Sequence, residues 1–188
     1  MTQNLSIVEG AKALAHEAHD SIQQVRKWTG IEYWHHTDEV ARIVSQVTDD
    51  VAVIAAAHLH DLAEDVTPEN PFYSIGLIQE RFGSRVSGFV LDLTDLYTKS
   101  AYPQWNRATR KRKECERLGL TAPESQTVKL ADCISNTADI VKNDPQGFAV
   151  TYLREIRELL PFLHQGNMPL WIRATQQVND ACAELKID

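Results

Sequence analysis

The chain has 188 residues, of which 43% are hydrophobic and 24% charged, and its formal net charge is −7. This length predicts one domain, residues 1–188, that is long enough to bury a sizeable core, and the composition is ordinary for a globular protein. The acidic balance argues against a protein that binds nucleic-acid duplexes, because such proteins usually carry a basic excess.

Cysteine usage and the N-terminal sequence bear on the compartment. The three cysteines, Cys115, Cys133 and Cys182, are widely spaced and form no CxxC motif, so we expect reduced thiols rather than disulfides or a cysteine zinc site. The first twenty residues lack a basic segment followed by an apolar one, and no apolar run approaches the ~18 residues of a membrane span. The sequence predicts a cytoplasmic protein without a membrane partner and leaves its oligomeric state open.

Helical periodicity dominates the first part of the chain. Apolar residues at steps of three and four predict one face of a long first helix: Val8, Ala11, Ala15, Ala18, Ile22 and Val25. After a break at Gly30, "TDEVARIVSQV" predicts a short helix that begins at Thr37 or Asp38. Residues 49–66 are at first apolar nearly all round, which predicts a central, buried helix ended by Thr67 and Pro68.

The rest of the chain continues the helical pattern. We expect helices over residues 74–83, 84–97, 102–119, 121–143, 145–163 and 170–185. Gly83 is the expected stop of the first of these, and Thr121-x-x-Glu124 has the pattern of a capping box. No segment alternates as a strand would. The prediction is therefore an all-α protein, with a motif-bearing core at about residues 13–140 and C-terminal helices at 145–185.

The end of the apolar helix carries the most unusual pattern. "AAAHLHDLAEDVTP" places His60, Asp61, Glu64 and Asp65 directly after small apolar residues. Residues three and four apart share one face of a helix, so these four side chains crowd one flank. Unpaired carboxylates there would repel one another and lose hydration, and a divalent cation removes that cost.

Two other segments offer further ligands for such a cation. "YWHHTDEV" contains His35 and His36, and "VKLADCISN" contains Asp132, which shares a helix face with Lys129 and Asn136. Imidazole and carboxylate ligands together suit manganese, iron or zinc, and such an ion makes a bound water a stronger nucleophile. The remaining histidines, His16, His19, His58 and His164, are read as surface or internally satisfied side chains, and Cys133 as a small core residue.

The order H…HD…D, with each member on or beside a helix, resembles the HD phosphohydrolase superfamily of helical metal enzymes. More specifically, "HLHDLAEDV" resembles the HD-x-x-ED box of the hydrolase domain of RelA/SpoT alarmone enzymes. "RKWTGIEYWHHTDEVARI", "IQERFGSRVSGFVLDLT" and "VKLADCISN" resemble three other segments of that domain in the same order. The match covers roughly residues 13–140. With no synthetase region following, the chain resembles the small stand-alone alarmone hydrolases.

The resemblance assigns roles residue by residue. Because the family's first histidine ligand follows Tyr by three and precedes a VA pair by four, Tyr33 and Val40 point to His36 rather than His35. The implied metal ligands are His36, His60, Asp61 and Asp132, with Mn²⁺ as the usual ion and other divalent transition metals as alternatives. Glu64 and Asp65 match the pair that orients water and assists proton transfer. Arg26 and Lys27 match residues at the base and phosphates, and Asn136 matches an asparagine at the sugar.

The implied reaction is hydrolysis of the 3′-diphosphate of guanosine tetra- or pentaphosphate to pyrophosphate and GDP or GTP. A basic cluster is a candidate wall for the leaving pyrophosphate, although part of it is expected to be a solvated helix face: Arg107, Arg110, Lys111, Arg112 and Lys113.

The sequence departs from the family around the expected nucleotide pocket. The family's AH-x-GQ is replaced by "AHDSIQQV", Glu32 replaces a proline, and Asp95 stands where the VTKL lysine is expected, with Lys99 the nearest cation in sequence. These changes leave open an HD phosphohydrolase for another nucleotide, such as an adenosine alarmone or a nucleoside monophosphate. A non-enzymatic nucleotide-sensing domain is a third reading, which the retained Glu64 and Asp65 disfavour.

Overall fold

The computed structural model describes residues 2–187 and is helical throughout that range, apart from loops and one isolated β-bridge between Val25 and Glu32. The all-α prediction is confirmed. The chain divides into two compact units, Met1–Thr94 and Asp95–Asp188. No helix formed by the described residues is long and apolar enough to cross a membrane.

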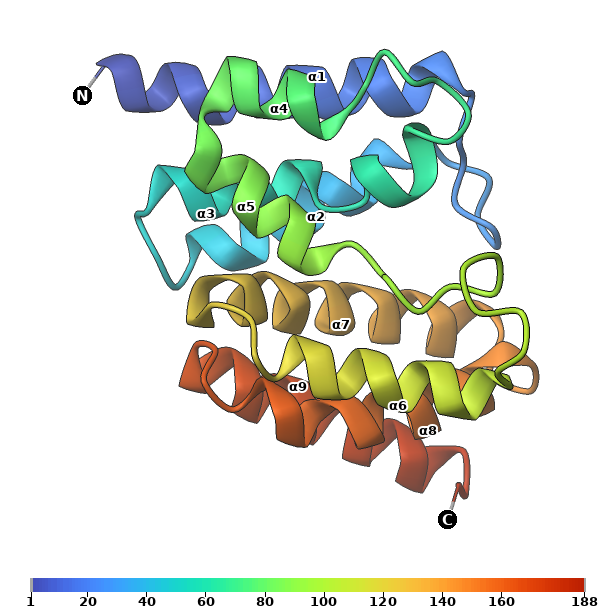
Figure 1. Cartoon of the computed structure of the whole chain (residues 1–188). Helices are drawn as coiled ribbons and strands as arrows, with labels where there is room; N and C mark the ends of the chain where they lie inside the picture. Colours follow the sequence, from blue (N-terminus) through green and yellow to red (C-terminus); the bar gives the residue numbers. More distant parts are fainter. Residues whose placement is uncertain (1, 188) are drawn as a thin grey trace. The chain divides into compact units, whose positions relative to one another are not determined.

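The first unit is built around a short apolar helix. It contains α1 (Thr2–Ser21), α2 (Trp34–Ser45), α3 (Val51–Leu59), the π-helix η1 (Leu62–Val66), α4 (Ile75–Phe82) and α5 (Ser84–Leu93). Helix α3 contacts α1, α2 and α5 (Figure 1), and nearly all its side chains are buried. Its central position was expected, because a helix that is apolar on every face is most stable when other helices bury all of its faces.

The second unit is a set of helices packed on α7. It contains α6 (Arg107–Leu118), α7 (Pro123–Asn143), α8 (Phe148–Leu159), the 3₁₀ helix η2 (Leu160–Leu163) and α9 (Met168–Glu184). Helix α7 contacts α8, η2 and α9, and α6 contacts α8 and η2. The buried side chains of α7 include Asp132 as well as apolar residues such as Leu130 and Ile134.

The first helix is shorter than its apolar pattern predicted. It ends at Ser21, and Val25, expected on its buried face, is 51% exposed. The chain turns sharply at Gln23, whose φ of 51° lies in the left-handed region. It then forms a loop closed by two backbone hydrogen bonds. Arg26 N–H donates to Ile31 O (2.8 Å), and Tyr33 N–H donates to Gln24 O (3.0 Å). These tertiary bonds outweigh the continuation of the helix.

The boundaries of α2 and α3 also differ from the prediction. Helix α2 begins at Trp34, not at Thr37 or Asp38, so His35 and His36 lie within its first turn. Helix α3 begins after Asp50, whose carboxylate accepts from Ala52 N–H at 3.0 Å. The expected single helix to Val66 is interrupted after Leu59 and resumes as η1.

Two expected features farther along the chain are corrected, and a third is confirmed. Helix α5 ends at Leu93, before the predicted limit of residue 97. Helix α7 has no capping box: the residue before it is Ala122, which gives no side-chain cap, and Thr121 donates its hydroxyl to Leu118 O at 2.8 Å. Gly83 does separate α4 from α5, with a φ of 87° that favours glycine.

Candidate active site

The turn after α3 fixes the protonation of His60. Its Nδ1 lies 2.9 Å from the carbonyl oxygen of Ala57, and the ring is buried. A carbonyl can only accept, so Nδ1 carries the proton and donates it. In the neutral ring, Nε2 then presents a lone pair, as a metal ligand requires.

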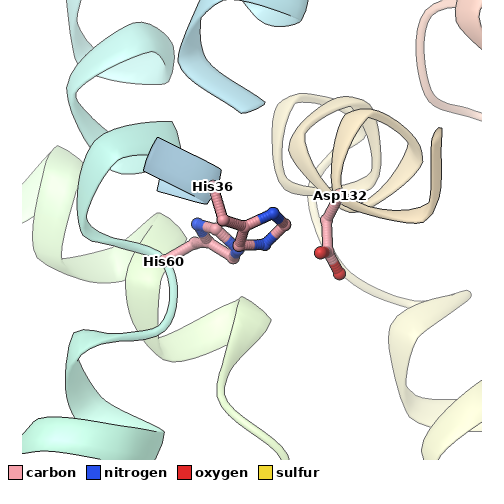
Figure 2. Close-up of side chains that lie close together, drawn as sticks. All are labelled: His36, His60 and Asp132. Carbon is pink, nitrogen blue, oxygen red and sulfur yellow. The ribbon is translucent and has the colours of Figure 1, made fainter. Parts of the chain in front are cut away.

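His36 and Asp61 meet His60 at that nitrogen. Nε2 of His60 lies 3.1 Å from Oδ2 of Asp61, and Nε2 of His36 lies 3.6 Å from the same oxygen. The rings of His36 and His60 stand edge to face, with centroids 5.3 Å apart (Figure 2). His35, by contrast, has a side chain that is 48% exposed and points its Nε2 toward Glu32, 3.7 Å away.

This arrangement fits a bound cation. Two neutral imidazole nitrogens facing one carboxylate oxygen would bring lone pairs together in a buried place, which is unfavourable unless a proton or a metal ion lies among them. Nitrogen and oxygen donors in this combination suit a divalent transition metal. Tyr33 donates its hydroxyl to Oδ2 of Asp61 at 2.7 Å, which holds the carboxylate in place.

The two expected catalytic carboxylates lie on η1, directly after this cluster. Glu64 and Asp65 are both half-buried. Oδ2 of Asp65 accepts from Nε2 of Gln24 at 2.8 Å. Burial, followed by the charge of Asp61, raises the pKa of Asp65 to about 6. An aspartate with that pKa exchanges protons near neutral pH, as a general base does.

The structure separates the two expected basic residues at the substrate. Arg26 is buried, with its guanidinium 5.7 Å from the centre of the Tyr33 ring. Lys27 is exposed and lies against Trp28, 5.1 Å from the ring centre. Arg26 therefore shares a neighbour, Tyr33, with the histidine–aspartate cluster, whereas Lys27 faces the Trp28 side of the loop.

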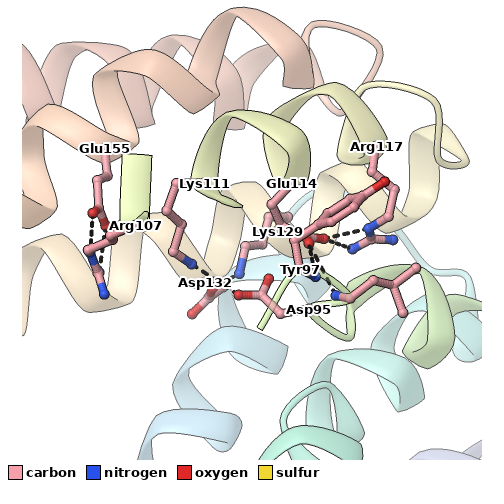
Figure 3. Close-up of polar contacts among 10 residues, drawn as sticks. Asp95, Tyr97, Arg107, Lys111, Glu114, Arg117, Lys129, Asp132 and Glu155 are labelled. Carbon is pink, nitrogen blue, oxygen red and sulfur yellow. Dashed lines mark hydrogen bonds and ion pairs between the residues drawn. The ribbon is translucent and has the colours of Figure 1, made fainter. Parts of the chain in front are cut away.

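Asp132 and Asn136 belong to the second unit. Oδ2 of Asp132 accepts from Lys129 Nζ at 2.9 Å, and Oδ1 accepts from Asn136 Nδ2 at 2.6 Å. All three side chains come from one face of α7, as their spacing predicted. Figure 3 shows Asp132 and Lys129 in this unit beside the polar residues of α6 and α8.

A cavity of about 280 Å³ in the second unit opens beside these residues. Asp132, Lys129 and Asn136 line it, together with the apolar and aromatic side chains Ile140, Phe148, Tyr152 and Ile156. The lining also carries charged side chains from α6 and α8, among them Arg107, Lys111 and Glu155, so a small molecule bound there would meet both apolar surface and charge.

The basic cluster of α6 divides into two parts. Arg107 and Lys111 line the cavity, whereas Lys113 pairs with Glu116 at 2.7 Å. Arg107 forms a two-point ion pair with Glu155, at 2.5 and 2.8 Å (Figure 3). Lys111 Nζ lies 3.0 Å from Oδ2 of Asp95. Lys111 from α6 thus supplies a cation beside Asp95, whereas Lys99 is exposed.

The cysteines agree with their expected structural role. Cys115, Cys133 and Cys182 are buried, and none is in a disulfide. Burial raises the pKa of Cys115 to about 11 and that of Cys133 to about 12. Such thiols carry almost no thiolate near neutral pH and are poor nucleophiles.

Sequence reasoning missed two polar residues near the site. His19, expected to be either a surface or an internally satisfied histidine, is fully buried, and its Nδ1 lies 2.6 Å from Oε1 of Gln24. Gln24 in turn contacts Asp65. The usable signal was the family's AH-x-GQ pattern, in which histidine and glutamine precede the basic pair, although the insertion here obscures the spacing.

Comparison with known proteins supports the reading of these motifs. A family model described as "HD domain" matches residues 11–159. The mouse protein named guanosine-3′,5′-bis(diphosphate) 3′-pyrophosphohydrolase MESH1 is 31% identical over 144 residues, which are 75% of this chain and 74% of that protein. The human protein of the same name is 30% identical over 69% of this chain and 67% of its own length.

A solved structure agrees over nearly the whole chain. It is described as a metazoan ortholog of SpoT that hydrolyzes ppGpp and plays a role in starvation responses. The two chains are 25% identical with a TM-score of 0.77, and the match covers 95% of this chain and 94% of that one. The motifs, the family match and the relatives agree: the chain belongs to the HD-domain family of helical phosphohydrolases.

Proposed function

We propose that this protein hydrolyses the 3′-diphosphate of guanosine tetra- and pentaphosphate, releasing pyrophosphate and leaving GDP or GTP. The observation that carries the proposal is the convergence of His36 Nε2 and His60 Nε2 on Oδ2 of Asp61, directly before Glu64 and Asp65. The reaction class comes from its relatives, since the MESH1 proteins carry the name of this activity.

The proposed metal ligands are His36, His60, Asp61 and Asp132, and the proposed ion is Mn²⁺. The first three converge within one unit, and the H…HD…D resemblance adds Asp132. When bound, a divalent ion lowers the pKa of water and screens phosphate charge. Tyr33 and Ala57 orient two of the ligands, because they hydrogen-bond Asp61 and His60 respectively.

Glu64 and Asp65 supply the proton chemistry in this proposal. The oxygen of water forms a bond to the phosphorus next to O3′, the bond between that phosphorus and O3′ breaks, and O3′ takes the proton that the water gave to a carboxylate. One of the two carboxylates accepts the proton that the attacking water loses. Asp65 is suited to this because its raised pKa brings it close to neutral pH.

The whole chain, residues 1–188, is proposed to be one HD hydrolase domain, with the substrate residues that the family resemblance assigns. Arg26 and Lys27 would contact base and phosphate, and Asn136 the ribose. The cavity beside Asn136 carries Phe148 and Tyr152, whose rings suit a base or sugar face. A small nucleotide is the only partner proposed, with no nucleic acid or membrane, and a cytoplasmic location accords with the three unbridged cysteines.

One observation favours a second candidate substrate. Asp95 pairs with Lys111 at the cavity, where the family resemblance places a lysine and no acid. This pairing reduces the positive charge that a phosphate would meet, so an HD phosphohydrolase of another nucleotide, such as an adenosine alarmone or a nucleoside monophosphate, is the alternative.

A product panel separates the two candidates. Purified protein with Mn²⁺ is assayed for pyrophosphate and orthophosphate release from guanosine and adenosine 3′-diphosphates and from nucleoside monophosphates, with a chelated sample as control. We expect pyrophosphate from the guanosine compounds and its loss on chelation. Turnover of adenosine compounds or monophosphates alone would replace the proposed substrate with the alternative.

A further inference from the structure

Asp65 ends a chain of hydrogen bonds, and its carboxylate fixes which atom donates at each step of that chain. The Asp65 carboxylate accepts, so the amide nitrogen of Gln24 must face it, 2.8 Å from Oδ2. The amide oxygen of Gln24 then faces His19, whose Nδ1 is 2.6 Å away. Because an amide oxygen only accepts, Nδ1 of His19 carries the proton. The chain therefore runs from His19 through Gln24 to Asp65.

The contact that His19 makes through Nδ1 has an energetic cost at its other ring nitrogen, Nε2. The residue is fully buried, burial lowers its pKa, and its ring stays neutral. With the proton on Nδ1, the buried Nε2 has no hydrogen-bond partner among the described residues. An unpaired buried acceptor is unfavourable, and an apolar side chain would avoid it. The hydrogen bond to Gln24 therefore accounts for a histidine at this buried position.

The backbone of the loop fixes Gln24 from both sides. Its N–H donates to His19 O at 3.1 Å, and its carbonyl accepts from Tyr33 N–H at 3.0 Å. Gln24 and Tyr33 are thereby paired across the loop, and each donates to a carboxylate after α3: Gln24 to Asp65, and Tyr33 to Asp61. The loop thus orients one acid of the proposed metal site and one acid of the proposed catalytic pair.

We propose that His19 and Gln24 are positioning residues that hold the Asp65 carboxylate in the orientation in which it accepts a proton. This inference rests on the proposed function. A positioning contact of this kind acts mainly on the chemical step, because a small displacement of a catalytic group lowers the rate without removing substrate binding.

A matched pair of substitutions tests the contact at His19. The side-chain amide of asparagine occupies the place of Nδ1, whereas that of glutamine extends toward the place of Nε2. His19→Asn should therefore keep the donor to Gln24 and most of kcat. His19→Gln and Gln24→Leu should each lower kcat about 10- to 100-fold, with KM within about twofold and unchanged metal content. Equal kcat in the two His19 variants and the wild type would overturn the proposal.

Nuclear magnetic resonance of the imidazole nitrogens tests the same hydrogen bonds without measuring activity. In the wild type His19 should be the Nδ1–H tautomer with a slowly exchanging proton, and Gln24→Leu should abolish that protection. An Nε2–H tautomer would overturn the inferred direction. If the wild type hydrolyses no alarmone, the proposed function fails and the catalytic role of this chain fails with it, while the spectra still decide whether the hydrogen bonds exist.

Discussion

Nε2 of His60 lies 3.1 Å from Oδ2 of Asp61, although the two residues are consecutive in the chain. Consecutive side chains on a regular α-helix point about 100° apart. Here α3 ends at Leu59 and the π-helix η1 begins at Leu62, so the turn between them brings both side chains to one point. Short π-helical segments are frequent at functional sites.

The first prediction concerns which histidine of the His35–His36 pair binds metal. His36→Ala should lose the bound ion, because it removes one of the nitrogens that face Asp61. His35→Ala should retain it, because the His35 side chain is 48% exposed and directed at Glu32. Elemental analysis of both proteins after loading with Mn²⁺ and desalting makes the comparison. Metal loss in His35→Ala alone would show that the motif is aligned one residue off.

The second prediction separates chemistry from binding at Glu64. Glu64→Gln preserves the size of the side chain and one acceptor oxygen, but the amide cannot take up a proton near neutral pH. It should bind nucleotide and metal normally and lose on the order of 10² in kcat, the usual effect of a positioned acid–base group. Steady-state kinetics on guanosine tetraphosphate with measured metal content provide the test. Wild-type turnover in this variant would leave Glu64 without a role in proton transfer.

The sequence alone predicted the residue types of the site better than its geometry. Helical periodicity and the buried character of α3 located His60 and Asp61 at the end of an apolar helix, as the structure confirms. The regular helix assumed there predicted i,i+4 pairs, and the π-helix was missed, because nothing in "HDLAEDV" marks a change of hydrogen-bond register. The contact between the consecutive residues His60 and Asp61 depends on that turn, so it was missed as well.

The loop before α2 was unpredictable for a related reason. Its shape depends on tertiary hydrogen bonds such as Tyr33 N–H to Gln24 O, which carry no local signature. The apolar pattern of the first helix therefore ran on to Val25 in the prediction, although the chain has already turned at Gln23. The sequence left open whether His19 is a surface or an internally satisfied histidine, because its partner, Gln24, lies beyond that turn.

The third prediction uses the strain at Gln23. Its φ of 51° costs free energy for a residue with a Cβ, whereas glycine adopts that conformation readily. Gln23→Gly should raise the free energy of unfolding by about 0.5–1 kcal/mol, after allowance for the greater entropy of glycine in the unfolded chain. Gln23→Ala keeps the Cβ and is the matched control, with no such gain. Urea denaturation of the three proteins decides, and equal midpoints for glycine and alanine would refute the strain.

The fourth prediction concerns stability in acid. Burial lowers the pKa of His58 to about 4, even though Asp38 lies 3.2 Å from its Nδ1 and opposes the shift. The folded pKa is below the unfolded value of 6.5, so only the unfolded chain takes up this proton as the pH falls between the two. Stability contributed by neutral His58 is therefore complete above pH 6.5 and is lost progressively down to about pH 4, by about 2–3 kcal/mol.

His58→Gln isolates this contribution. Chelated protein is used for wild type and variant, so that release of metal from protonated His36 and His60 does not enter the comparison. The variant should lose less unfolding free energy than the wild type between pH 7 and pH 4. Parallel curves over that range would mean that His58 is not the group responsible.

The most direct test of the account follows the oxygen of water into the products. Guanosine tetraphosphate is hydrolysed by the Mn²⁺-loaded protein in ¹⁸O-water, and the masses of the products are measured by mass spectrometry. If water attacks the phosphorus next to O3′, each pyrophosphate carries one ¹⁸O atom and the GDP carries none. Unlabelled pyrophosphate, label in the GDP, orthophosphate as the product or no turnover at all would contradict hydrolysis of the 3′-diphosphate at this site.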